Sequence, residues 1–183
     1  MVVKTQFFLF CFLLITLTLP AQAEIPATLK IDDTELALNG QGVRKKFMMS
    51  IYHGGLYLAA SSSDAAKIVA ADEAMAIRID MVSGLITSEK MVDALMEGLD
   101  NSTGGDIAPL QQYVDQFIAV FKEEIKEGDY FDLAYIPGKG LEIYKQGSLK
   151  ATITGGMPFK QAIFGIWLGN TPADKNLKKG MLG

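Results

Sequence analysis

Seven stretches of alternating or unbroken apolar residues predict β-strands in this chain. They are residues 29–31, 35–38, 43–58, 75–82, 130–136, 141–145 and 149–154. The last three lie close together, and Pro137-Gly138-Lys139-Gly140 and Gln146-Gly147 supply turns between them. Because consecutive strands are near enough to form hairpins, the pattern predicts a largely antiparallel sheet.

Other stretches carry apolar residues at spacings of three and four, which predicts helices. They lie at residues 87–101, 106–125 and 158–169, with shorter helices ending at residue 71 and following residue 175. The apolar stripe of the second helix could contact a partner or a membrane. Its opposite side carries ordinary solvated charge, so core packing is the preferred interpretation. Strands that bracket helices indicate an α+β domain, with helices covering one face of the sheet and ligand space between the layers.

The first residues are predicted to be a secretory signal peptide. Lys4 precedes an apolar run over residues 7–19, Pro20 ends that run, and Ala21-Gln22-Ala23 has the small-x-small pattern of a cleavage site. We expect cleavage after Ala23, which leaves residues 24–183 as one periplasmic or secreted domain. An uncleaved N-terminal anchor is the alternative, but the run is short for a stable membrane insertion.

The net charge and the few cysteine and histidine residues limit the partners and metal sites that the chain can have. The formal net charge is −4 without a basic stripe, which argues against nucleic acid or an anionic membrane surface as a partner. The one cysteine, Cys11, lies in the predicted signal peptide, and His53 is the one histidine. Neither a thiolate site nor a multi-histidine metal site can be built from them, and no hydrolase, phosphate-loop or calcium-loop motif is present. We predict no metal, no cofactor and no catalytic residue.

The segment after residue 38 carries the candidate chemistry. Asn39-Gly40-Gln41-Gly42 reads as a turn, and Arg44 then opens the predicted strand over residues 43–58. Tyr52 follows eight positions later, so along an unbroken strand both side chains would share a face. A cation and a hydroxyl beside apolar surface suit a ligand with an anionic head and an apolar body. Alternatively, Arg44 is merely a solvated residue at the start of a strand.

Three motifs together resemble the chalcone isomerase-like superfamily. They are residues 42–58, the passage from Ile77-Arg78-Ile79-Asp80 to Thr87-Ser88-Glu89-Lys90, and the ending Ile166-Trp167-Leu168-Gly169-Asn170-Thr171-Pro172-Ala173-Asp174-Lys175. The resemblance covers essentially all of residues 24–183 and is strongest to bacterial exported members. It implies an open-faced β-sandwich, in which a large antiparallel sheet is covered on one face by a helical layer. It also implies either isomerisation of an enone or binding of a fatty acid.

The same resemblance assigns Arg44 and Tyr52 to ligand binding. Fatty-acid binders of the family have a tyrosine where Tyr52 stands, whereas the plant isomerases have a threonine there. The position of the isomerases' catalytic tyrosine is held here by Thr87, and their asparagine falls near Ala94. The groups that would polarise the enone and orient water are therefore absent from the matching positions.

We therefore expect an exported, non-enzymatic binder of a fatty acid or a similar amphipathic carboxylate, including an aromatic one. The alternative is a chalcone isomerase-type intramolecular lyase, with Arg44 stabilising an anion and Tyr52 donating a proton. A third interpretation, an envelope interaction protein using an exposed helix face, has no motif in its favour. Methionines at positions 48, 49, 81 and 91 could line an adaptable cleft or simply fill the core. Nothing in the sequence indicates the oligomeric state.

Overall fold

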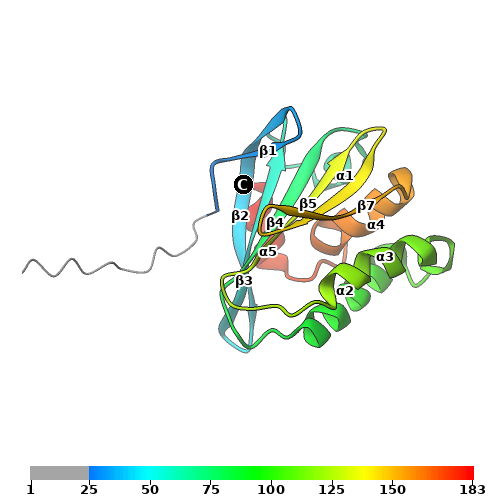
Figure 1. The fold of residues 1–183 in the computed structure, drawn as a ribbon. Helices are drawn as coiled ribbons and strands as arrows, with labels where there is room; N and C mark the ends of the chain where they lie inside the picture. The colour runs from blue at the N-terminus through cyan, green and yellow to red at the C-terminus, as the bar shows by residue number, and fades with distance from the viewer. Residues whose placement is uncertain (1–24) are drawn as a thin grey trace, which may run out of the picture.

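The computed structural model describes residues 25–183, which form a seven-stranded antiparallel sheet with helices packed on one face (Figure 1). The strands are β1 (Thr28–Ile31), β2 (Thr34–Lys46), β3 (Met49–Leu58), β4 (Met75–Met81), β5 (Tyr130–Ile136), β6 (Gly140–Lys145) and β7 (Ser148–Ile153), and they follow one another across the sheet in chain order. The predicted α+β fold with a helical layer on one face is confirmed. The predicted signal peptide, including the cleavage position at Ala23, lies outside the described residues.

The helices are α1 (Ala65–Ala70), α2 (Ser88–Thr103), a short 3₁₀ turn η1 (Ala108–Leu110), α3 (Gln111–Phe121), α4 (Gly156–Leu168) and α5 (Lys175–Leu182). The main core lies between these helices and the sheet, where Phe121 of α3 packs against Phe131 of β5, and Phe117 of α3 packs against Phe159 of α4. The stripe predicted for residues 106–125 does face this core, although it is divided between η1 and α3. No helix within residues 25–183 is both long and apolar enough to span a membrane.

The single strand predicted for residues 43–58 is wrong. The chain reverses at Phe47 and Met48, and β2 and β3 pair as an antiparallel hairpin. Both turn residues have left-handed backbones, with φ of 50° and 69°. This conformation usually requires glycine or asparagine and costs roughly 1 kcal/mol or more at a residue with a larger side chain. Two apolar residues therefore hid the turn from a prediction based on turn chemistry.

The glycine turn predicted at residues 39–42 is also wrong, because these residues lie inside β2. Their small size serves packing: a Cβ atom on Gly40 would lie 2.3 Å from the carbonyl oxygen of Gly180 in α5. Asn39 sits at an irregularity in the pairing with β3 and donates hydrogen bonds to the carbonyls of Ser62 and Met181. Helix α5 thus lies directly against the backbone of β2.

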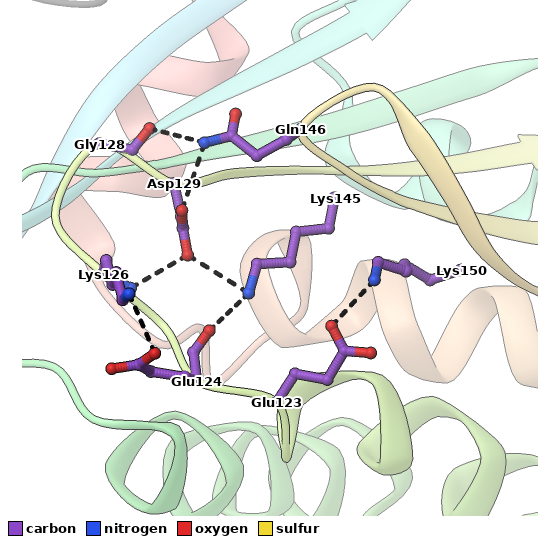
Figure 2. Close-up of polar contacts among 8 residues, drawn as sticks. All are labelled: Glu123, Glu124, Lys126, Gly128, Asp129, Lys145, Gln146 and Lys150. Carbon is purple, nitrogen blue, oxygen red and sulfur yellow. Dashed lines mark hydrogen bonds and ion pairs between the residues drawn. The ribbon is translucent and has the colours of Figure 1, made fainter.

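A polar network holds the segment between α3 and β5 against the hairpin of β6 and β7 (Figure 2). Lys145 donates to the Glu124 carbonyl and pairs with Asp129 at 3.3 Å, while Lys150 pairs with Glu123 at 2.9 Å. Gln146 adds a hydrogen bond to Asp129. These contacts hold the segment that follows α3 beside strands β6 and β7.

A fully buried lysine joins two helices of the layer. The Lys160 ammonium on α4 donates to the carbonyls of Ile68, Val69 and Ala71 at 2.8–2.9 Å, so it satisfies the C-terminal end of α1. Burial lowers the pKa of Lys160 to about 8. Three carbonyl acceptors explain why a cation is tolerated there.

The sheet face opposite the helices holds a second polar cluster. Arg78 on β4 forms a bidentate ion pair with Asp132 on β5, with both N–O distances 2.7 Å. Asp80 lies two residues along β4, opposite His53 of β3, and is only 4% exposed. Its Oδ1 atom has no hydrogen-bond partner. Burial raises the pKa of Asp80 to about 6, with the Asp132 charge adding to that effect and Arg78 opposing it.

Asp80→Asn should therefore remove part of the pH dependence of folding. The native state holds the Asp80 proton more tightly than the unfolded chain, so stability falls as pH rises from about 4 to about 6 and stays lower above that range. The neutral amide should raise the free energy of unfolding at pH 7–8 by at most about 3 kcal/mol. Urea denaturation, followed by fluorescence of the one tryptophan, Trp167, measures this change.

The exposed Asp33→Asn is the matched control, because it removes the same charge from a solvated position. The interpretation fails if Asp80→Asn and the wild type lose stability equally between pH 5 and pH 7.

Candidate functional site

Arg44 and Tyr52 are direct cross-strand partners in the β2–β3 hairpin. They share a face because they lie opposite each other across two strands, not because an even number of residues separates them on one strand. The Arg44 guanidinium carbon lies 5.7 Å from the centroid of the Tyr52 ring. This is within the range of a cation–π contact, so the ring helps to orient the cation.

Tyr52 is buried beneath Arg44 and points toward the helical layer. Its side chain is 2% exposed, and its hydroxyl accepts a hydrogen bond of 2.8 Å from the Trp167 indole N–H on α4. Burial raises the pKa of Tyr52, although the Arg44 charge and the Trp167 hydrogen bond act in the opposite direction. The phenol therefore stays protonated at neutral pH. Within residues 25–183 no acceptor takes the hydroxyl hydrogen itself.

Arg44 lines a pocket of about 300 Å³ at the margin between the sheet and the helices. The walls come from the hairpin, from the loop after β4 and from α2, and they consist of Arg44, Lys46, Phe47, Met49, Ile51, Leu85, Ile86, Lys90 and Ala94. Apart from the three cations the lining is apolar, and it includes no carboxylate. Arg44 forms no ion pair with any residue that the structure describes. The pocket therefore offers a cation to an anionic group beside apolar walls.

Two helix starts fix the edges of this pocket. Asp174 caps α5 by accepting from the N–H groups of Asn176 and Leu177, and its second oxygen accepts from the Lys45 N–H of β2 at 3.3 Å. At the start of α2, the Thr87 hydroxyl accepts from the Lys90 N–H. The Lys90 ammonium in turn donates to the Leu85 carbonyl at 2.9 Å.

The two predicted site residues, Arg44 and Tyr52, differ in their position relative to the pocket. Arg44 lines the pocket, whereas Tyr52 lies behind it and does not. Ligand binding by either residue remains a prediction. The deep space expected between sheet and helices is filled by side chains such as Tyr52 and Trp167, so the pocket opens at its margin.

The four methionines considered for the cleft also fall into two groups, one near the pocket and one in the core. Met49 lines the pocket and Met48 is 97% exposed, whereas Met81 and Met91 fill the core. Lys90, Leu85 and Ile86 were not predicted as site residues, because only tertiary structure brings the start of α2 beside the hairpin. The Thr87-Ser88-Glu89-Lys90 helix start was the one signal in that region.

The pocket contains no evident acid–base pair. Its titratable side chains are Arg44, Lys46 and Lys90, the Thr87 hydroxyl is occupied as a helix cap, and Ala94 offers a methyl group. His53 faces the other side of the sheet, opposite Asp80. In the described part of the chain, no three His, Cys, Asp or Glu side chains gather in a way that could hold a metal ion.

A larger groove of about 760 Å³ runs along the helical layer between α1, α2 and α4. Its lining mixes small residues with polar ones such as Ser63, Asp64 and Gln161. Its one cation, Lys178, donates to the Gly169 carbonyl, and the Asp64 carboxylate also faces it. This groove is less suited to an anionic amphipathic ligand than the Arg44 pocket.

Comparison with known proteins agrees with this architecture. The profile of the family described as chalcone isomerase-like matches residues 20–183. Among solved structures, the fold is similar to that of a fatty-acid binding protein from Arabidopsis thaliana, with a TM-score of 0.66 and 21% sequence identity over 86% of this chain and 90% of that one. At that identity the likeness shows the fold alone. No curated protein sequence matches the chain significantly.

Tyr52→Phe should destabilise the fold, because it leaves the buried Trp167 N–H without its acceptor. We expect the free energy of unfolding to fall by about 1–3 kcal/mol, measured by urea denaturation. Tyr113→Phe is the control, since no hydrogen bond of its hydroxyl is found within residues 25–183. Equal stability of Tyr52→Phe and the wild type would mean that the Trp167–Tyr52 hydrogen bond adds nothing to the packing.

Proposed function

The chain belongs to the chalcone isomerase-like family, and on that basis we propose that it is an exported binder of a fatty acid or a similar amphipathic carboxylate. One observation carries the proposal: Arg44 has no carboxylate partner within residues 25–183, and it lines a pocket whose other residues are apolar except for Lys46 and Lys90. The fold it shares with a fatty-acid binding protein supports this, although the likeness extends only to the fold. The secretory pattern of residues 1–23 supports export.

The carboxylate would be bound by Arg44. A guanidinium can donate two parallel hydrogen bonds to a carboxylate, and such charge-assisted bonds contribute roughly 1.5–3 kcal/mol in a partly desolvated site. Tyr52, which lies behind the pocket, would act by orienting Arg44 through its ring. Lys46 and Lys90 would add positive potential at the rim.

The apolar part of the ligand would lie along Met49, Ile51, Leu85 and Ile86. Each methylene removed from water contributes about 0.8 kcal/mol, so the chain supplies much of the affinity while the head sets its orientation. The volume of about 300 Å³ is at the lower end of the range for small-molecule sites. This favours a slender acyl chain over a bulky ring system.

Binding without conversion is the better interpretation of the same residues. Isomerisation of an enone needs groups that stabilise an anion and move a proton. Arg44 could do the first, but the pocket lining offers no histidine, carboxylate or tyrosine for the second. We therefore propose a binding protein and keep a chalcone isomerase-type lyase as the alternative.

Arg44→Ala should weaken binding of dodecanoate by at least about tenfold to a hundredfold, which corresponds to the loss of one charge-assisted hydrogen bond. Dissociation constants can be measured by calorimetric titration below the micelle-forming concentration. Dodecan-1-ol is the matched ligand, because it keeps the chain and removes the charge. Its affinity should be weak and should change little between the wild type and Arg44→Ala.

Lys30→Ala is the matched protein control, since Lys30 is an exposed cation on β1 outside the pocket. The proposal is overturned if the wild type does not bind dodecanoate, or if Arg44→Ala binds it as tightly as the wild type. An equal loss in Lys30→Ala would show that only net charge matters.

The alternative activity has a direct test. Because the pocket lining has no histidine, carboxylate or tyrosine to move a proton, the protein should not speed the loss of chalcone absorbance at neutral pH beyond the rate in buffer. Acceleration that Arg44→Ala abolishes would establish the lyase and displace the binding proposal.

A further inference from the structure

One end of the molecule carries an exposed apolar cluster, which we call the hairpin patch. It consists of Phe47, Met48 and Met49 at the turn of the β2–β3 hairpin and Leu85 in the loop after β4, with exposed fractions of 84%, 97%, 45% and 52%. Among the described residues, only Leu149 is a further large hydrophobic residue with comparable exposure. Single exposed apolar residues are ordinary, but a gathered set marks an interaction surface.

Cations surround the hairpin patch. Arg44, Lys45 and Lys46 precede the turn, and the Lys90 ammonium is held against the Leu85 carbonyl. No acidic residue occurs between Asn39 and Ser63, although the whole chain has a formal net charge of −4. Three carboxylates border the same region: Asp174 caps α5 and accepts from the Lys45 N–H, Glu127 accepts from the Gly84 N–H, and Glu89 is exposed at the start of α2. The hairpin itself, with Arg44, Lys45 and Lys46 and no acidic residue, is thus opposite in the sign of its charge to the whole molecule.

The turn itself is unusual for a solvent-exposed hairpin. Phe47 and Met48 hold left-handed backbones that asparagine and glycine adopt more easily, and their side chains project away from the core. The paired strands β2 and β3 support the turn, but within the described chain the side chains of Phe47 and Met48 stay largely exposed. Figure 1 shows the hairpin projecting beyond the rest of the sheet at the end where the chain leaves β4 for α2.

We propose that the hairpin patch docks on an anionic lipid bilayer. Phe47 and Met48 enter the boundary between head groups and acyl chains, while Lys45, Lys46 and Lys90 contact the lipid phosphates. Peripheral binding of this kind combines buried apolar area with attraction to anionic lipid, and the hairpin patch supplies both. The proposal differs from the sequence-based expectation, in which the charge of the whole chain argued against an anionic membrane surface, because it considers how the charge is distributed.

A second copy of the chain fits this surface less well. A two-fold dimer through the hairpin patch would bring two sets of lysines together, and like charges would oppose it. A bilayer with negative head groups complements the same cations. Docking requires no ligand in the Arg44 pocket, so the inference goes beyond the proposed function and stands independently of it.

The test is co-sedimentation with vesicles of phosphatidylcholine alone and of phosphatidylcholine mixed with phosphatidylglycerol. The protein is the full chain as its host processes it, with the N-terminus identified by mass spectrometry and identical in every variant. We expect binding to the mixed vesicles that is weakened by salt, and little binding to phosphatidylcholine alone.

Two double substitutions separate the apolar from the electrostatic contribution to vesicle binding. Phe47→Asn with Met48→Gly gives the turn its preferred residues, so it should raise the urea midpoint while reducing vesicle binding at least about tenfold. Lys45→Glu with Lys46→Glu should reduce vesicle binding by more than about 25-fold, since each lysine near an anionic surface contributes about fivefold to the binding constant. Loss of binding in a variant of raised stability cannot be attributed to misfolding.

Matched controls use the same chemistry elsewhere. Leu149→Ser removes an apolar residue that is 52% exposed, as Leu85 is, and Lys30→Glu with Lys122→Glu reverses two exposed lysines. Both should bind mixed vesicles like the wild type, whereas Leu85→Ser should bind less. The proposal is overturned if the wild type does not bind mixed vesicles, if the Asn-Gly turn variant binds equally well, or if the control lysines matter as much. A dimer that this turn variant abolishes, without vesicle binding by the wild type, would identify a second copy as the occupant.

Discussion

Helix α5 lies directly on the backbone of β2, and this close approach decides where the candidate site can be. A Cβ atom on Gly180 would lie 2.4 Å from the Gln41 carbonyl oxygen, so neither surface has room for a larger residue. Leu177 and Met181 are buried against Gly54 of β3, which holds the helix over both strands. The start of α5 is thereby fixed beside Lys45 through Asp174. Beyond that point the helix no longer covers the hairpin, and Arg44 lies at the boundary.

This boundary explains how a cation can remain available at a well-packed interface. Below Arg44, Tyr52 and Trp167 close the space between sheet and helices through a buried hydrogen bond. A buried guanidinium would need a carboxylate partner, as Arg78 has in Asp132 on the other face. Arg44 is only partly buried and has no such partner in the described part of the chain, so its charge is available to the pocket. Close packing in one layer therefore leaves a pocket at the margin of the same layer.

Sequence periodicity predicted the sheet and the helical layer because most strands and helices bury one face, and that pattern is local. It could not show the turn at Phe47 and Met48, where two apolar residues occupy a conformation that favours asparagine and glycine. It also could not distinguish a glycine needed for a turn from Gly40, which is needed for contact with α5. Arg44 and Tyr52 were placed on one face for the wrong reason. Lys90 was missed because its neighbourhood depends on how α2 packs.

The pocket and the hairpin patch share Phe47, Met49 and Leu85, with Lys46 and Lys90 at their common rim. On the two proposals together, docking would place the pocket mouth at the membrane surface, where an acyl chain could enter without crossing water. The arrangement also accounts for a turn that violates local preferences: an Asn-Gly pair would make a better hairpin but would remove the apolar wall and the membrane contact at once. Strained backbone conformations cluster at functional sites, so an outlier of this kind leads to a hypothesis of function. For this chain, a single exposed turn would contribute to both the ligand pocket and the membrane contact.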